Sequence, residues 1–251
     1  MKSETTKQFK RFTLVRQEML SINNLHSAYG EAQVLNGISM NIYPGEIVAI
    51  LGRNGMGKTS LVRSIMNFSF PKKTSGSVSI SGQDFSVLEP HQISSLGVGY
   101  VPQGRRLFES LTVLEHLKIL ECNKENAWSV DRAFQEFPRL EERKFHRGNQ
   151  LSGGERQMLA IARALMTGPQ IILMDEPTEG LAPVTVELVE KILIKLRQEG
   201  LGILLVEQNF YSAMSVADRV YILEAGKVVW SGLPEELTSN LEIQGRYLGI
   251  H

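Results

Sequence analysis

The sequence predicts an α/β fold with a mainly parallel sheet. From Ser21 onward, apolar runs of strand length alternate with stretches of helical periodicity, which is the order of elements typical of such folds. The middle of the chain, from about Val87 to Gln150, is expected to form mainly helices and loops. A chain of 251 residues with average apolar content is long enough to bury one substantial core. We therefore expect one folded unit with a helical insertion.

The expected elements follow one another closely along the chain. Candidate strands are Ile22–His26, Val34–Ile42, Ile47–Leu51, Ser77–Ser81, Val98–Val101, Ile171–Met174, Ile203–Val206, Val220–Leu223 and Val228–Trp230. Helices are expected to follow Lys58, Leu111, Ser129, Ser152, Val184, Asn209 and Pro234. Residues 1–18 form a polar extension that is expected to be disordered and lacks the apolar stretch of a secretory signal. A start at Met19 is an alternative, because the strand pattern begins there.

Composition argues against several classes of function. Lysine plus arginine balances aspartate plus glutamate at 27 each, so bulk charge indicates neither a nucleic acid nor an anionic membrane surface as partner. Cys122 is the only cysteine, which excludes an internal disulfide or a cysteine metal cluster and favours a small buried side chain. The longest apolar runs have strand length, so no helix is expected to cross a membrane.

The first chemical motif is Gly52-Arg53-Asn54-Gly55-Met56-Gly57-Lys58-Thr59, which follows an apolar run and opens a helical pattern. This is the context of a phosphate-binding P-loop, because the glycines let backbone N–H groups point at phosphate oxygens and the helix adds its positive end. Lys58 is then placed for the β- and γ-phosphates of ATP, and the Thr59 hydroxyl for Mg²⁺. The alternative is a simple glycine turn. The predicted nucleotide-binding residues of this segment are Gly52, Asn54, Gly55, Gly57, Lys58, Thr59 and Ser60.

The second motif is the apolar run Ile171–Met174 followed by Asp175 and Glu176. A buried strand that ends in aspartate can hold Mg²⁺, directly or through water, and the next carboxylate can polarise the attacking water. Asp175 is therefore assigned to the metal and Glu176 to the general base. Two solvated carboxylates at a strand end are the alternative, which the P-loop makes less favoured.

The third motif, Leu151-Ser152-Gly153-Gly154-Glu155-Arg156-Gln157, opens another helical pattern. It resembles the signature sequence of the ABC ATPases, and the resemblance runs from Ile22 to the C-terminus. In that family this segment binds the γ-phosphate of ATP held by a second subunit. The resemblance therefore implies nucleotide contacts from Ser152, Gly153, Gly154 and Glu155, and a helix N-terminus suits an anion. It also implies an N-terminal antiparallel β subdomain and an ATP-binding domain over residues 19–251, with a helical subdomain at about 87–165, between the Q-loop and the signature.

Further positions match the family in order. Tyr29 resembles the aromatic residue that stacks on adenine, and a simply packed tyrosine is the alternative. Gln103 resembles the Q-loop glutamine that touches Mg²⁺ or the attacking water. The segment Arg105–Leu117 corresponds to the surface that docks a membrane subunit; an ordinary loop and amphipathic helix is the alternative.

Two segments depart from the commonest family pattern. The chain has Glu179-Gly180-Leu181-Ala182 where many members carry Ser-Ala-Leu-Asp, and Gln208 where most have a switch histidine. Glutamine can donate a hydrogen bond to the γ-phosphate or orient water, but it cannot gain charge near neutral pH. Glu176 is therefore expected to act as base without a protonatable partner at position 208.

These departures, with the segments around Gln103 and Glu207, resemble bacterial importers of branched-chain amino acids, urea or short amides. The resemblance implies a second ABC ATPase subunit, identical or different, two transmembrane permease subunits, a solute-binding protein and no nucleic acid. It places the chain on the cytoplasmic face of the bacterial inner membrane. Two other functions stay open: the ATPase of an exporter or lipid transporter, which more often keeps the histidine, and a soluble ABC ATPase acting on ribosomes or DNA.

Overall fold

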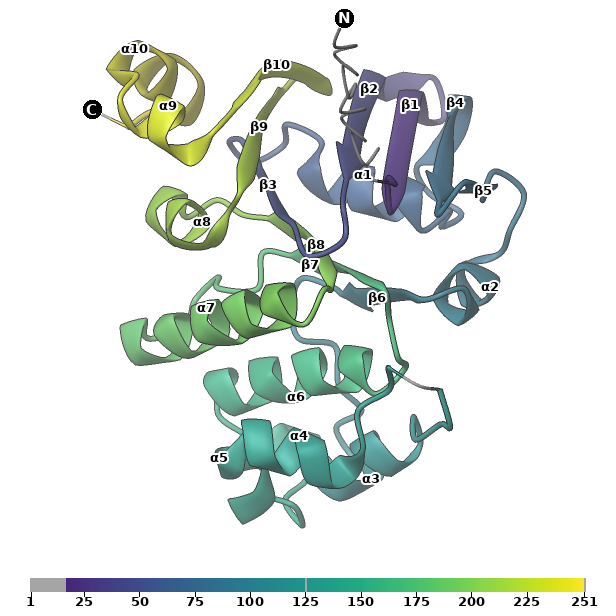
Figure 1. The fold of residues 1–251 in the computed structure, drawn as a ribbon, viewed down its shortest axis with the longest axis vertical. Coiled ribbons are helices and arrows are strands. Elements are labelled where there is room, and N and C mark those ends of the chain that lie inside the picture. Colours follow the sequence, from purple (N-terminus) through teal and green to yellow (C-terminus); the bar gives the residue numbers. More distant parts are fainter. Residues whose placement is uncertain (1–16, 125, 251) are drawn as a thin grey trace, which may run out of the picture.

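The computed structural model describes residues 17–124 and 126–250, which form two sheets surrounded by helices (Figure 1). The antiparallel sheet has the order β2-β1-β4-β5 and the larger sheet the order β10-β9-β3-β8-β7-β6. The first sheet contains β1 (Leu20–Tyr29), β2 (Ala32–Ile42), β4 (Lys72–Ile80) and β5 (Gln83–Asp84). The second contains β3 (Ile47–Leu51), β6 (Val98–Val101), β7 (Ile171–Asp175), β8 (Gly202–Val206), β9 (Arg219–Glu224) and β10 (Lys227–Gly232).

The larger sheet is parallel except at one edge, so the predicted α/β class is confirmed. Strand β3 pairs in parallel with β8 and β9, and β7 with β6 and β8, whereas β9 and β10 are antiparallel. Each predicted strand overlaps an observed one. The helices are α1 (Lys58–Ile65), α2 (Pro90–Ser95), α3 (Val113–Lys118), α4 (Val130–Glu136), α5 (Pro138–Glu142), α6 (Gly153–Leu165), α7 (Pro183–Gln198), α8 (Phe210–Val216), α9 (Pro234–Thr238) and α10 (Leu241–Ile243), with short turns at Gly148–Gln150 and Gln244–Leu248.

Side chains alternate between the two faces of the central strands and so contribute to separate cores on opposite faces. Ile172 and Leu205 pack in the core that contains residues of α6 and α7, while Leu173 and Leu204 pack in the core that contains residues of α1. Helix α1 and the pair α6–α7 therefore cover opposite faces of the sheet (Figure 1). Every residue of β3, β7 and β8 is buried, as expected for strands covered on both sides.

The helical part of the chain lies beyond α6 (Figure 1). Helices α3, α4 and α5 supply Val113, Leu117, Phe134 and Leu140 to the core shared with α6. Strand β6, at residues 98–101, belongs to the large sheet although it falls inside the predicted helical range 87–165. The domain boundaries stay a prediction, as does the extension at 1–18, of which residues 1–16 lie outside the described part.

Two observations concern compartment and membrane. The expectation that Cys122 is buried is wrong, because its thiol is exposed in the loop between α3 and α4, where Sγ lies 3.5 Å from the carbonyl oxygen of Met166. Among the helices of the described residues, none combines the length and apolar character that a bilayer-crossing segment needs.

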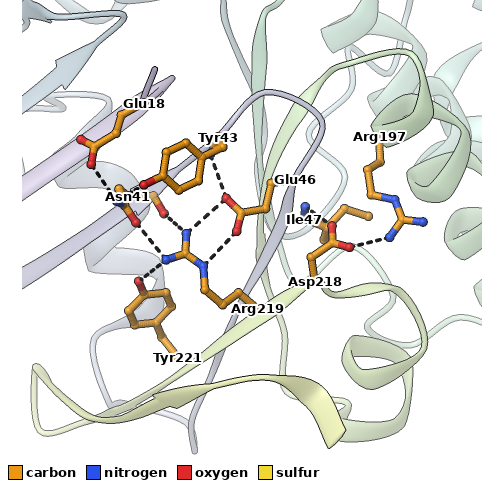
Figure 2. Close-up of polar contacts among 9 residues, drawn as sticks. All are labelled: Glu18, Asn41, Tyr43, Glu46, Ile47, Arg197, Asp218, Arg219 and Tyr221. Atoms are coloured by element: carbon orange, nitrogen blue, oxygen red, sulfur yellow. Dashed lines mark hydrogen bonds and ion pairs between the residues drawn. The ribbon is translucent and has the colours of Figure 1, made fainter. Parts of the chain in front are cut away.

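A polar network ties the two sheets together at the amino ends of the parallel strands (Figure 2). The Arg219 guanidinium at the start of β9 donates from Nε and Nη2 to the two carboxylate oxygens of Glu46, at 2.9 and 3.2 Å. It also donates to the side-chain and carbonyl oxygens of Asn41 in β2, at 2.9 and 2.6 Å. Next to it, Asp218 accepts from the backbone of Ile47 and pairs with Arg197 at 2.8 Å. The network fixes β2, β3 and β9 relative to one another.

Candidate active site

The P-loop connects β3 to α1 and has a backbone that only glycine accommodates at two positions. A Cβ on Gly52 would collide with the carbonyl oxygen of Leu223 in the neighbouring strand β9. Gly57 has φ of 103° as the N-cap of α1, a left-handed conformation that costs little without a Cβ. These two glycines permit the tight curl of the loop, which binding of an anion by backbone N–H groups requires.

Lys58 is buried at the first position of α1 and brings the P-loop against the carboxylate after β7. Its ammonium donates to the carbonyl oxygens of Gly52 and Arg53 at 2.8 and 3.3 Å and lies 3.2 Å from Glu176 Oε1. Lysine has three donors, and these contacts use all of them. A phosphate that binds Lys58 must therefore take the place of at least one, and the Glu176 carboxylate is the anion it competes with.

Asp175 at the end of β7 has one carboxylate oxygen that accepts a hydrogen bond and one that does not. Thr59 Oγ1 donates to Oδ1 at 3.1 Å, whereas the buried Oδ2 has no hydrogen-bond partner within the described residues. Burial raises the pKa of Asp175 to about 6, helped by the nearby Glu176 charge and opposed by the Thr59 hydrogen bond. A hydroxyl beside an unpartnered carboxylate oxygen fits Mg²⁺, which prefers oxygen ligands and is usually shared with substrate phosphates. Within the described residues no three histidine, cysteine or acidic side chains cluster as a self-sufficient metal site would.

Gln103, in the loop after β6, reaches the same carboxylates. Its Nε2 donates to Glu176 Oε2 at 3.0 Å and to Glu179 Oε2 at 2.9 Å. Glu176 itself has φ of 51°, which is uncommon for a residue with a side chain and found most often at functional sites. The structure thus joins Lys58, Glu176 and Gln103, which are far apart in the sequence.

Lys58, Gln103 and Glu176 line a cleft of about 320 Å³. Asp175 instead lines a second cavity of about 640 Å³, which shares Thr59 and Gln103 with the first. The lining of the smaller cleft contains most of the predicted P-loop residues, Gln103 and Glu176, and also two residues that the sequence did not suggest, Val34 and Glu179. The full lining is Val34, Asn54, Gly55, Gly57, Lys58, Thr59, Ser60, Gln103, Glu176 and Glu179. Tyr29 stands at the end of β1 near this cleft, 41% exposed, with its Oη 3.5 Å from Ser60 Oγ.

A family model described as "ABC transporter" matches residues 35–179, which run from β2 through the P-loop to the loop after β7. This chain belongs to the ABC transporter family. Its activity is that of the family's ATPase cassettes, the hydrolysis of ATP.

Similar proteins extend this ABC assignment over nearly the whole chain. The high-affinity branched-chain amino acid transport ATP-binding protein BraG of Pseudomonas aeruginosa is 38% identical over 92% of this chain and all of its own length. The lipopolysaccharide export system ATP-binding protein LptB of Haemophilus influenzae is 35% identical over 92% of this chain and 97% of its own. A dimeric post-hydrolysis state of the ATP-binding cassette MJ0796 bound to ADP and Pi superposes with a TM-score of 0.76, at 30% identity over 86% of this chain and 99% of that one.

The ABC signature segment begins α6, where its polar side chains cap the helix. Ser152 Oγ accepts from the Glu155 backbone N–H at 3.2 Å, and Glu155 Oε2 accepts from the Ser152 N–H at 2.8 Å. This is a capping box, which the spacing Ser-Gly-Gly-Glu predicts directly. The backbone N–H groups of Gly153 and Gly154 are left as the anion-binding part of this helix end. None of these four residues lines the cleft described above.

Gln208, at the position of the family's switch histidine, lies exposed between β8 and α8. The buried residue before it does the local anchoring: Glu207 accepts from the backbone and hydroxyl of Thr178 at 3.0 and 2.7 Å and from the Gln208 N–H at 3.2 Å. Burial raises the pKa of Glu207, and these hydrogen bonds oppose the shift. No anchoring role for Glu207 was predicted from the sequence, although an acidic residue directly after the apolar run Ile203–Val206 is a visible signal.

Proposed function

We propose that this chain energises a membrane importer for branched-chain amino acids, or for urea or short amides. The observation that carries the proposal is the 38% identity to BraG along that protein's full length. The branched-chain amino acid transport protein LivF of Archaeoglobus fulgidus, described as probable, supports it at 37% identity over 99% of its length.

The working unit in this proposal is a pair of ATPase subunits beneath two permeases. A P-loop and a signature segment from the same chain serve different ATP molecules, so two chains close around two nucleotides. The dimeric state of the MJ0796 cassette with ADP and Pi supports such a pair. Closure and reopening would shift the permeases between their inward- and outward-facing states. A solute-binding protein would deliver the solute, and the chain would act at the cytoplasmic face of the bacterial inner membrane.

The proposed chemistry assigns one task to each group of the cleft. Lys58 and the P-loop N–H groups bind the β- and γ-phosphates, and this releases the Glu176 carboxylate from its contact with Lys58. Glu176 then orients and deprotonates the attacking water, while Gln103 holds Glu176 in place. Thr59 and Asp175 would hold Mg²⁺, which would neutralise phosphate charge.

Lipid export is the second candidate, because LptB is nearly as similar as BraG. The position of Gln208 favours import, since exporters and lipid transporters of this family more often keep histidine there. The two functions predict different partners and opposite directions of transport.

Co-purification tests the assembly. Tagged Glu176→Gln is isolated from its native cells in mild detergent with ATP and Mg²⁺, and the retained proteins are identified by mass spectrometry. The proposal predicts two multi-spanning proteins and a second ATPase. Ribosomal or DNA-repair proteins without membrane subunits would contradict transport, and a lipopolysaccharide-binding assembly would favour export.

Uptake tests the solute. Cells that lack the gene are complemented with the wild-type chain or with Lys58→Ala, and the accumulation of labelled leucine, urea and acetamide is measured. The proposal predicts that one of these solutes accumulates only with the wild-type chain. Equal accumulation of all three in both strains would contradict it.

A further inference from the structure

Arg105 joins three segments that surround the cleft, and we propose that it is a positioning residue for ATP hydrolysis. It fixes the loop that carries Glu179, and through Glu179 it holds the Gln103 amide against Glu176. The inference rests on the ATPase activity and not on the identity of the transported solute.

The guanidinium lies between the loop after β7 and the start of α6. One Nη2 hydrogen bond goes to the backbone carbonyl of Glu179. A Cβ placed on Gly153 would lie 3.0 Å from Nη1, and one placed on Gly180 would lie 3.6 Å from Nη2. Arg105 has φ of 52°, so its backbone is in a region that side chains rarely adopt. One side chain thus bridges the Gln103 loop, the 179–180 loop and the signature helix.

The next link is the Gln103 amide. A side-chain amide nitrogen has two hydrogens, and here Nε2 donates to Glu176 at 3.0 Å and to Glu179 at 2.9 Å. Both hydrogens are therefore used, and the two carboxylates together set the orientation of the amide. If Glu179 moves, Gln103 loses one of its two acceptors and Glu176 loses a fixed neighbour.

This chain carries Glu179 where many members of the family have the first serine of Ser-Ala-Leu-Asp. The hydrogen bonds above connect that departure to Arg105 and Gln103, which lie on a different loop. Glu179 and Arg105 therefore act together to connect the two loops. Because the guanidinium binds the backbone of Glu179, removal of the Glu179 side chain leaves the Arg105 hydrogen bond in place but removes what it positions.

The test is steady-state ATP hydrolysis by the purified full chain and its variants. Arg105→Ala is expected to lower kcat about tenfold, because small displacements of catalytic groups have effects of this size or larger. KM for ATP should stay within about twofold, since Arg105 does not line the nucleotide cleft. Arg105→Lys keeps a donor for the Glu179 carbonyl and should recover kcat to within about threefold of wild type, without the planar fork.

A double-mutant cycle separates positioning from general destabilisation. In the Glu179→Ala background, Arg105→Ala should lower kcat by less than about twofold, because the residue it positions is gone. Arg139→Ala is the matched control, since its guanidinium pairs with Glu142 on the exposed surface of α5. The control should leave kcat unchanged. Thermal melting verifies that all variants are folded.

Three outcomes would overturn the proposal: wild-type kcat in Arg105→Ala, fully multiplicative losses in the double variant, or an equal loss in Arg139→Ala. Failure of the importer hypothesis would leave all of these measurements intact, because they depend on ATP turnover alone.

Discussion

The charged side chains at the two ends of the parallel strands differ in how completely they are paired. At the amino ends, Arg219 is paired with Glu46 and Asp218 with Arg197, each supported by further hydrogen bonds (Figure 2). At the carboxyl ends, the buried Asp175 keeps one oxygen without a partner in the described residues, and Lys58 contacts Glu176, the proposed general base. The charged groups at the amino ends are paired within the chain, whereas the pairing at the carboxyl ends would be completed by a ligand.

This difference has a physical reason. A buried polar atom without a partner costs about 1–3 kcal/mol, so it is retained only where something else offsets the cost. In the proposed function, nucleotide phosphates and Mg²⁺ would supply that offset at the carboxyl ends of the strands. Substitutions at the carboxyl ends of the strands should therefore change activity more than stability. Substitutions at the amino ends should change stability more than activity.

The largest effects are expected from Glu176 and Lys58. Glu176→Gln should still bind ATP but lower turnover about 10³-fold, because general base catalysis typically contributes this much. Lys58→Ala should abolish hydrolysis by weakening phosphate binding. Both variants are compared with wild type in steady-state ATP hydrolysis and nucleotide titration. Normal turnover by Glu176→Gln, assayed with its partner subunits, would remove Glu176 from the base role.

Substitutions in the Arg219 network, at the amino ends of the parallel strands, should mainly change stability. Arg219→Ala leaves the mostly buried Glu46 without its cation, so the free energy of unfolding is expected to fall by about 3 kcal/mol. Arg219→Lys keeps the charge but loses the two-pronged contact, and should lose about half as much. Urea denaturation measures both. ATP turnover per folded molecule should stay near wild type. A large loss of turnover in a well-folded variant would contradict the difference proposed between the two ends of the strands.

The ionisation of Asp175 should make the free energy of unfolding depend on pH. Its pKa is raised from the ordinary value of 3.8 to about 6, so the folded state binds the proton more tightly than the unfolded state. The contribution of Asp175 to the free energy of unfolding should therefore decrease as pH rises from 3.8 to about 6. Asp175→Asn removes this ionisation and should be more stable than wild type by about 2 kcal/mol at pH 7, without nucleotide or Mg²⁺. Stability curves against pH that run parallel for the two proteins would contradict the assignment.

Much of the fold follows from the sequence for a simple reason. The runs Ile171–Met174 of β7 and Ile203–Val206 of β8 are apolar at every position, so the sequence alone marks them as buried strands. The short elements could not be found in this way: α5 has five residues and β5 has two, too few to show a period. Helix α2 was missed although Glu89 and Gln92 form a capping box around its start.

Most residues that line the cleft could be named from the sequence, but the contacts between them could not. The P-loop and the Asp175-Glu176 pair carry their chemistry in residue type and spacing. The contacts of Arg105 and Glu179 depend instead on loop conformation, including positive φ at Arg105 and Glu176. Neither residue type favours that conformation, so the path from Arg105 to Gln103 becomes visible only once the loops are placed.

The smallest effect is expected from Tyr29. Substitution of this residue tests whether the nucleotide site extends beyond its charged groups. Tyr29 is 41% exposed beside the P-loop helix, so part of the residue is accessible to an adenine base. Tyr29→Ala should raise KM for ATP about fivefold with little change in kcat, because an aromatic contact contributes about 1 kcal/mol. Tyr29→Phe keeps the ring and loses only the long contact of Oη with Ser60 at 3.5 Å, so its KM should match wild type. Equal damage from both substitutions would show that the hydroxyl matters and the ring face does not.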